Sequence, residues 1–213
     1  MGSSILIYDF DGVICESVDI KTEAYRELYA DVRPDQMEEI VRYHLANGGV
    51  SRFRKIEHIE VNILAAATGP DAWQRRAERF AALVKDRVIR SPYVPGVRAF
   101  IERHAMTHQQ YICTGTPESE MRDITDARGI SRFFTGIYGS PATKVTILTR
   151  IIQEASVDAS TCVFFGDALT DHEAAVAIGV PFVGVASHHT EFPVETVVIR
   201  DFHDPMLAQV LQR

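Results

Sequence analysis

The chain has 213 residues, of which 46% are hydrophobic and 24% charged, as expected for one globular domain with a sizeable insertion or for two small domains. Its formal charge of −7 argues against a general nucleic-acid-binding protein, because there is no basic surplus to neutralise phosphates. No apolar run approaches membrane-spanning length, and the first residues lack the charged n-region of a signal peptide. We therefore expect a cytoplasmic protein without membrane or nucleic-acid partners.

The three cysteines, Cys15, Cys113 and Cys162, are odd in number and far apart in the sequence. Cys113 and Cys162 lie inside runs that are typical of strands. Buried free thiols are therefore expected rather than a disulfide or a metal site, which fits a reducing cytoplasm.

Short apolar runs bounded by turn residues predict six buried parallel strands. They cover residues 4–8, 110–114, 135–139, 161–165, 181–185 and 196–199. Helical patterns lie between the later strands: one follows Pro95, one ends at Gly129 and one covers residues 142–155. This alternation predicts an α/β fold with a Rossmann-like, doubly wound parallel sheet.

About a hundred residues separate the first two strands, which is too many for one crossover. Three stretches of this gap carry apolar side chains at helical spacing, a pattern more typical of a small helical bundle than of a cofactor site. These stretches are residues 34–49, 52–69 and 71–89. We therefore predict an all-helical inserted domain at residues 15–91. The core domain is then made of residues 1–14 and 92–213, with "SPYVPG" marking the return to the sheet.

Polar residues gather where the predicted strands end, and ligands of open parallel sheets bind at that edge. They are Asp9, Asp11, Thr114, Gly115, Lys144, Asp167 and Asp171. Several carboxylates with few nitrogen ligands favour a hard cation such as Mg²⁺. A hydroxyl, backbone amides and a lysine suit the oxygens of a phosphoryl group. Each residue alone has an ordinary structural explanation, but their convergence on one edge predicts an active site.

The arrangement resembles the haloacid dehalogenase superfamily, and the likeness covers nearly the whole chain. Members of that family carry a strand ending in DxD, a strand ending in Thr or Ser, a later Lys, and a strand ending in GDxxxD. The corresponding residues here are Asp9 and Asp11, Thr114, Lys144, and Asp167 and Asp171. The helical insertion directly after "DFDGVICES" resembles the C1 cap of subfamily I, in the branch of phosphoglycolate phosphatases and β-phosphoglucomutases.

The resemblance implies a Mg²⁺-dependent phosphatase that hydrolyses a small phosphorylated metabolite. Asp9 would attack phosphorus and form an aspartyl-phosphate, while Asp11 would act as general acid and base. The carboxylates of Asp9 and Asp167 and the backbone carbonyl of Asp11 would hold Mg²⁺.

The same resemblance assigns the phosphate-binding residues. Thr114 and the amide of Gly115 would bind phosphoryl oxygens, and Lys144 would neutralise charge in the transition state. Asp171 would position Lys144 or a metal-bound water.

Three features bear on the choice among family members. Dehalogenases and phosphonate hydrolases lack the second acid of DxD, so Asp11 indicates chemistry at a P–O bond. The stretch "NGGVSRFRK" resembles the cap loop of β-phosphoglucomutases, in which an arginine faces a second phosphate. Arg52 is therefore expected to bind an anionic group of the substrate, with Arg54 and Lys55 as further candidates and a solvated helix start as the alternative.

"FFGDALTD" has the form found in phosphatases, whereas the mutases of this branch tend to carry a Glu-Asp pair there. A β-phosphoglucomutase-like phosphosugar mutase remains the alternative function. A response-regulator receiver fits poorly, because it is much shorter and accepts phosphate on its third strand. We expect a monomer or a weak homodimer.

Overall fold

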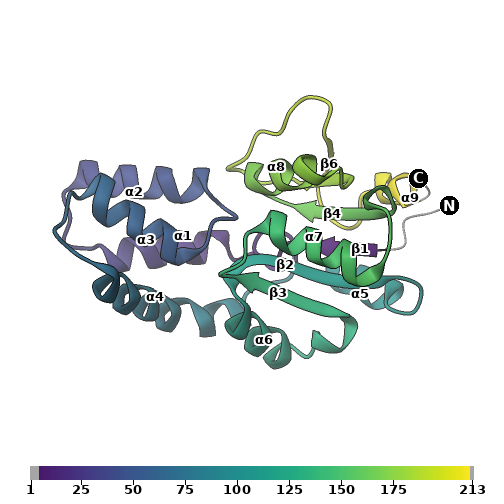
Figure 1. The fold of residues 1–213 in the computed structure, drawn as a ribbon, viewed down its shortest axis with the longest axis horizontal. Helices are drawn as coiled ribbons and strands as arrows, with labels where there is room; N and C mark the ends of the chain where they lie inside the picture. The colour runs from purple at the N-terminus through teal and green to yellow at the C-terminus, as the bar shows by residue number, and fades with distance from the viewer. Residues whose placement is uncertain (1–4, 212–213) are drawn as a thin grey trace.

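A computed structural model describes residues 5–211 and contains a six-stranded parallel sheet (Figure 1). The strand order is β3-β2-β1-β4-β5-β6. The strands are β1 (Ile5–Tyr8), β2 (Gln109–Pro117), β3 (Gly136–Ser140), β4 (Cys162–Gly166), β5 (Phe182–Val185) and β6 (Val197–Ile199). The structure confirms all six predicted strands and the doubly wound α/β fold. The first strand lies between β2 and β4, in the middle of the sheet.

Helices cover both faces of the sheet because successive side chains of a strand point to opposite sides. Leu6 and Tyr8 of β1 belong to a core that includes residues of α5 and α6, whereas Ile5 and Ile7 pack with residues of α7 and α8 (Figure 1). The helices of this part of the chain are α5 (Val97–His104), α6 (Glu118–Ala127), α7 (Lys144–Ala155), α8 (Leu169–Ile178) and α9 (Met206–Val210). Strands buried on both faces explain the continuous apolar runs in the sequence.

Every element between residues 18 and 90 is helical, and these helices lie together beside the sheet (Figure 1). They are α1 (Val18–Leu28), α2 (Pro34–Ala46), α3 (Arg52–His58), a π-helical turn (Ile59–Ile63) and α4 (Pro70–Arg90). We call residues 18–90 the helical insertion. Its helical content is as expected, while the predicted domain boundaries at residues 15 and 91 stay a prediction.

One predicted helix, over residues 52–69, ends earlier than expected, in the π-helical turn. Glu60 is fully buried there, and its carboxylate accepts from Thr68 Oγ1 (2.9 Å) and pairs with Arg76 (2.6 Å). The backbone carbonyl of Glu60 also accepts from the amide of Ala66 (2.8 Å). These contacts fold the chain back toward Glu60 and end the helix.

All three cysteines are buried free thiols, as predicted. Among the described residues, no helix is both long and apolar enough to cross a membrane.

Candidate active site

The predicted acids and the lysine meet at the carboxyl edge of the sheet. Asp9 directly follows β1, Asp167 follows β4, and Lys144 and Asp171 lie in the first turns of α7 and α8. All four side chains are at least nine-tenths buried. Neighbouring parallel strands thus bring together residues that are more than a hundred positions apart in the sequence.

Lys144 joins two of the carboxylates. Its Nζ donates to Asp171 Oδ1 and lies 3.1 Å from Asp9 Oδ2. The other oxygen of Asp171 accepts from the amide of Ala168 (3.2 Å), which fixes the carboxylate at the start of α8. Burial lowers the pKa of Lys144, but the carboxylates of Asp171 and Asp9 outweigh burial and raise this pKa above its usual value. Lys144 is therefore a fixed positive charge beside Asp9.

Asp9 and Asp167 carry an excess of negative charge in a buried place. Burial raises the pKa of Asp9 to about 6, since the charges of Asp171 and Asp11 add to it and Lys144 offsets only part. Burial, Asp9 and Asp171 raise the pKa of Asp167 well above its ordinary value. Oxygens of Asp9, Asp167 and Asp171 lie within 4.8 Å of one another, and Asp9 Oδ1 is buried with no hydrogen-bond partner in the described part of the chain. Clustered carboxylates and an unpaired oxygen fit a hard divalent cation, which would relieve this repulsion.

Gly12 allows the chain to turn away from the site. Its φ of +77° lies in the left-handed region, and a Cβ at this position would lie 2.2 Å from Asp167 Oδ2. Any side chain here would therefore displace Asp167 as well as strain the backbone.

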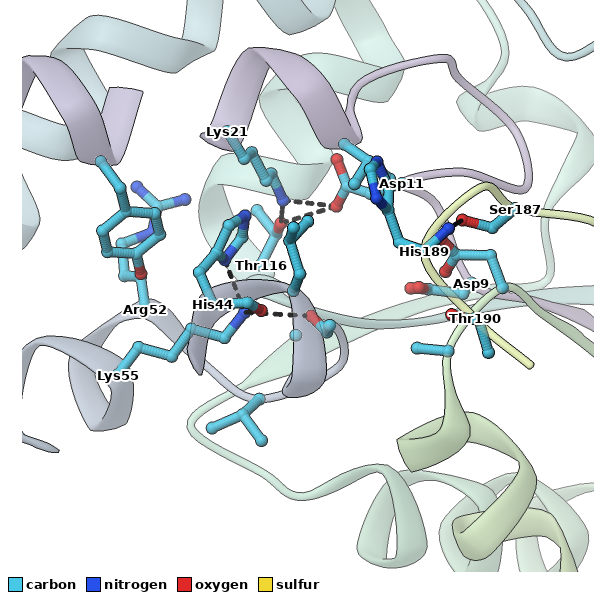
Figure 2. A pocket seen from close by; sticks show the side chains of 18 of the residues that line it. Asp9, Asp11, Lys21, His44, Arg52, Lys55, Thr116, Ser187, His189 and Thr190 are labelled. Atoms are coloured by element: carbon cyan, nitrogen blue, oxygen red, sulfur yellow. Dashed lines mark hydrogen bonds and ion pairs between the residues drawn. The ribbon is translucent and has the colours of Figure 1, made fainter. Parts of the chain in front are cut away.

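Asp11 is held differently from Asp9. Its Oδ1 accepts from Ser17 Oγ (2.6 Å), and its Oδ2 accepts from Lys21 Nζ and, at 3.5 Å, from Thr116 Oγ1. Lys21 also donates to Thr116 Oγ1 (2.8 Å) (Figure 2). Burial alone would raise the pKa of Asp11, but Lys21 and Ser17 lower it below the ordinary value. The pKa values of the two acids of the DxD motif are therefore shifted in opposite directions, and Asp11 is the one whose carboxylate form is stabilised by its contacts.

Thr114 and Gly115 lie near the carboxyl end of β2, at the same edge of the sheet, but their surroundings differ. Thr114 is buried, and its Oγ1 accepts from the amide of Thr116 (3.2 Å). A Cβ at Gly115 would lie 2.6 Å from the carbonyl oxygen of Gly49 in the helical insertion. A side chain at Gly115 would therefore collide with the backbone of the insertion.

The loop between α2 and α3 lies against the sheet edge. The amide of Gly49 donates to Thr170 Oγ1 (2.9 Å), and a Cβ at Gly48 would lie 2.8 Å from the Cβ of Ala168. Arg52 follows this loop and pairs with Glu120 of α6 (2.5 Å). The insertion is thus closed over the acids.

The closed arrangement encloses a cavity of about 50 Å³ between the insertion and the sheet edge. On the sheet side, the acids that line it are Asp9, Asp11 and Asp167. On the insertion side, it is lined by Lys21, His44, Arg52 and Lys55 (Figure 2). Tyr25 lines the same side. Carboxylates on one wall and cations on the other suit a metal ion and an anionic ligand between them.

Several of these contacts were not predicted from the sequence. Ser17 and Lys21, which hold Asp11, follow it by six and ten residues and match no pattern of the sheet edge. Thr116 was not among the residues predicted for the site. His44 lies in residues 34–49, one of the stretches with helical spacing, and that spacing gives no signal of a polar role. The proximity of these residues depends on how α1 and α2 pack, which local spacing does not encode.

The parallel sheet with acids at its carboxyl edge and a helical insertion over them defines an α/β enzyme with a covered active site. The family model of haloacid dehalogenase-like hydrolases matches residues 4–179. The chain therefore belongs to the haloacid dehalogenase-like hydrolases, as the motifs predicted.

Curated relatives and solved structures agree with this assignment. A phosphoglycolate phosphatase from Pseudomonas syringae pv. tomato is 28% identical over 195 residues, covering 85% of this chain and 69% of the relative. A β-phosphoglucomutase from Clostridium difficile superposes with a TM-score of 0.79 at 16% identity, covering 98% of this chain and 96% of that chain. CbbY from Rhodobacter sphaeroides, solved with phosphate, gives a TM-score of 0.73 at 19% identity and covers 94% of this chain and 95% of that chain. At these identities the solved structures show the fold alone.

Proposed function

We propose that this hydrolase is a Mg²⁺-dependent phosphatase acting on a small phosphorylated metabolite through an aspartyl-phosphate. The observation that carries the proposal is the buried group of Asp9, Asp167 and Lys144 at the sheet edge, closed off by the helical insertion. The curated phosphoglycolate phosphatases are similar over most of the chain and support phosphate-ester chemistry.

Asp9 is the proposed nucleophile. Asp9 lines the cavity, Lys144 lies 3.1 Å from one of its oxygens, and the other oxygen has no hydrogen-bond partner among the described residues. Mg²⁺ would be held by the carboxylates of Asp9 and Asp167 and the backbone carbonyl of Asp11, and when bound it would offset the repulsion between nucleophile and phosphate. Asp171 is the proposed positioning residue, because it anchors Lys144.

Asp11 is the proposed general acid and base. Ser17 and Lys21 favour its carboxylate form, which suits the step in which a base removes a proton from water. Protonating the leaving oxygen requires the opposite state, so these two contacts are expected to loosen when substrate is bound. Thr114, the amide of Gly115 and Lys144 are the proposed ligands of the phosphoryl oxygens.

The expected setting is cytoplasmic, without nucleic-acid or membrane partners, and the chain is expected to be a monomer or weak homodimer. Arg52 remains the residue predicted from the sequence to bind a second anionic group. It lines the cavity, although Glu120 already neutralises its guanidinium.

Steady-state hydrolysis of para-nitrophenyl phosphate with Mg²⁺ tests the function. We expect turnover that Asp9→Asn abolishes while the variant remains folded by circular dichroism. Isomerisation of a sugar phosphate without net release of phosphate would instead establish a mutase. Undiminished turnover in Asp9→Asn would refute the assignment of the nucleophile.

A further inference from the structure

The helical insertion contains a buried lysine, Lys55, that makes no ion pair with a carboxylate among the described residues. Lys55 is 3% exposed, and its Nζ contacts His44 Nδ1 (3.0 Å), the carbonyl of His44 (3.1 Å) and the carbonyl of Gly48 (3.5 Å). All three partners are neutral acceptors. A buried charge with neutral partners alone is costly, because carboxylates or bound anions normally compensate such charges.

The other cations of the cavity already have carboxylate partners. Lys21 pairs with Asp11, and Arg52 pairs with Glu120 while lying over the ring of Phe80. Lys55 therefore differs from both: among the described side chains that line the cavity, it is the lysine or arginine without an acidic partner.

Two further polar atoms of this wall have no partner. His44 and Tyr25 are 4% and 1% exposed, their rings lie 4.6 Å apart, and His44 Nε2 and Tyr25 Oη are buried without hydrogen bonds. Burial, Lys55 and Lys21 hold the pKa of His44 well below its usual value, so the ring is neutral. Because Nδ1 accepts from Lys55, the ring proton resides on Nε2. Both residues line the cavity, and each has a group that can donate a hydrogen bond and has no partner among the described residues.

We propose that Lys55, His44 and Tyr25 form a subsite that binds a second oxyanion of the substrate, a carboxylate. Two unpaired donors and an uncompensated cation offer what a carboxylate needs: opposite charge and hydrogen bonds to both oxygens. The two unpaired donors match the two oxygens of a carboxylate, whereas a second phosphate would bring a third oxygen with no donor for it among them. The subsite rests on the proposed phosphatase function and narrows it to short phosphorylated carboxylic acids.

The alternative role of Lys55 is to stabilise the loop alone, since it contacts carbonyls at both ends of residues 44–48. Loss of a loop-stabilising contact would lower the activity on every substrate equally, whereas loss of a carboxylate subsite would lower only the activity on substrates that carry the carboxylate. The test therefore compares two substrates: 2-phosphoglycolate and ethyl phosphate, in which a methyl group replaces the carboxylate.

The experiment measures kcat/KM for both substrates in the wild type, Lys55→Met, Tyr25→Phe and the control Arg42→Met. Arg42 is an exposed cation of the same helix as His44 and lies outside the cavity. We expect the wild type to prefer 2-phosphoglycolate. Lys55→Met should lower this preference by at least about tenfold, mainly through KM, and Tyr25→Phe by about threefold or more. Arg42→Met should leave the preference for 2-phosphoglycolate unchanged. A wild type without preference, or a preference unchanged in Lys55→Met and Tyr25→Phe, would overturn the subsite.

Calorimetric binding of 2-phosphoglycolate to Asp9→Asn, with and without Lys55→Met, keeps the two proposals separable. If phosphate release fails for both substrates but Lys55→Met weakens binding about tenfold, the subsite stands and the phosphatase proposal falls. Equal affinity of the two variants would overturn the subsite even if the enzyme is a phosphatase.

Discussion

The two walls of the cavity are built in opposite ways. At the sheet edge, Lys144 is matched by Asp9 and Asp171, and the acids together exceed the cations. On the insertion side, Lys55, His44 and Tyr25 present positive charge and donors without acidic partners. Under the two proposals made above, the sheet edge supplies the chemistry and the insertion selects the substrate. Changes at the sheet edge should therefore affect all substrates, and changes in the insertion should discriminate among them.

The largest effect is expected at the proposed metal ligand Asp167. Asp167→Asn should lower the rate at least about 100-fold and remove the dependence on Mg²⁺, because one of the carboxylates that would hold the ion is neutralised. The rate as a function of Mg²⁺ concentration and the stabilisation of the folded state by Mg²⁺ in thermal unfolding both measure this. Asp86→Asn, at an exposed position of α4, is the control. An unchanged Mg²⁺ response in Asp167→Asn would contradict the metal assignment.

Asp171 tests whether the sheet edge acts as one unit. Asp171→Asn removes the charge that anchors Lys144 but leaves Lys144 near Asp9. We expect a loss of about 10- to 100-fold in kcat, equal for 2-phosphoglycolate and ethyl phosphate. A loss confined to one of the two substrates would show that Asp171 helps to select the substrate, and would contradict the assignment of selection to the insertion alone.

Gly48 tests the contact between the two walls. A Cβ here would lie 2.8 Å from the Cβ of Ala168, too close for either to remain in place. Gly48→Ala should therefore lift the loop from the sheet edge and lower kcat/KM by about tenfold for both substrates. The double variant Gly48→Ala with Ala168→Gly removes the clash and should recover most of the activity. Failure of the second substitution to restore activity would show that the contact does not control closure.

Arg52 distinguishes closure from substrate binding. Since Glu120 neutralises the guanidinium, Arg52→Ala should lower kcat/KM by about three- to tenfold for both substrates, with Glu120→Ala giving a similar and non-additive loss. A greater loss with 2-phosphoglycolate than with ethyl phosphate would support the sequence-based prediction that Arg52 binds the anion.

The smallest effect concerns stability. Burial and the nearby charges of Lys21 and Lys144 lower the pKa of Lys55 from 10.5 to about 7, against the opposing effects of Asp11 and Asp167. Between pH 7 and pH 10.5 the unfolded chain holds a proton on Lys55 that the folded chain tends to lose. Protonation of Lys55 therefore destabilises the folded state most below pH 7, and this destabilisation vanishes above pH 10.5. Neutral His44, which contacts Lys55, adds no opposing charge.

Lys55→Met removes this contribution. The melting temperature of the variant relative to the wild type should be highest below pH 7, by a few degrees, and should fall as the pH approaches 10.5. A difference that does not change with pH would show that Lys55 is not buried as a destabilising cation.

The sheet and its edge could be predicted because their signals are local. Buried strands such as β1 are short apolar runs, and the fold alone requires that the residues following them meet at one edge. Asp9, Asp167 and Lys144 could thus be placed together without knowledge of side-chain positions. The resemblance of the DxD and GDxxxD motifs to a known family supplied their proposed roles.

The insertion wall could not be predicted in the same way. His44 and Tyr25 occupy helical positions that read as ordinary core, and only the packing of α1 against α2 brings their rings together. Lys21, in the first turn of α1, reaches back to Asp11 across residues 12–17, a contact that local spacing does not encode either. Arg52 was expected from its motif to face substrate, while its ion pair with Glu120 depends on how the insertion sits on α6.

The central claim is that Asp9 carries the phosphoryl group during turnover. Rapid acid quenching of the enzyme with 2-phosphoglycolate or para-nitrophenyl phosphate and Mg²⁺, followed by mass spectrometry of its peptides, tests this directly. We predict a phosphoryl group on Asp9 that appears during turnover, disappears when substrate is exhausted and is absent from Asp9→Asn. Phosphate release at full rate with no phosphorylated Asp9, or with the group on another residue, would contradict the account.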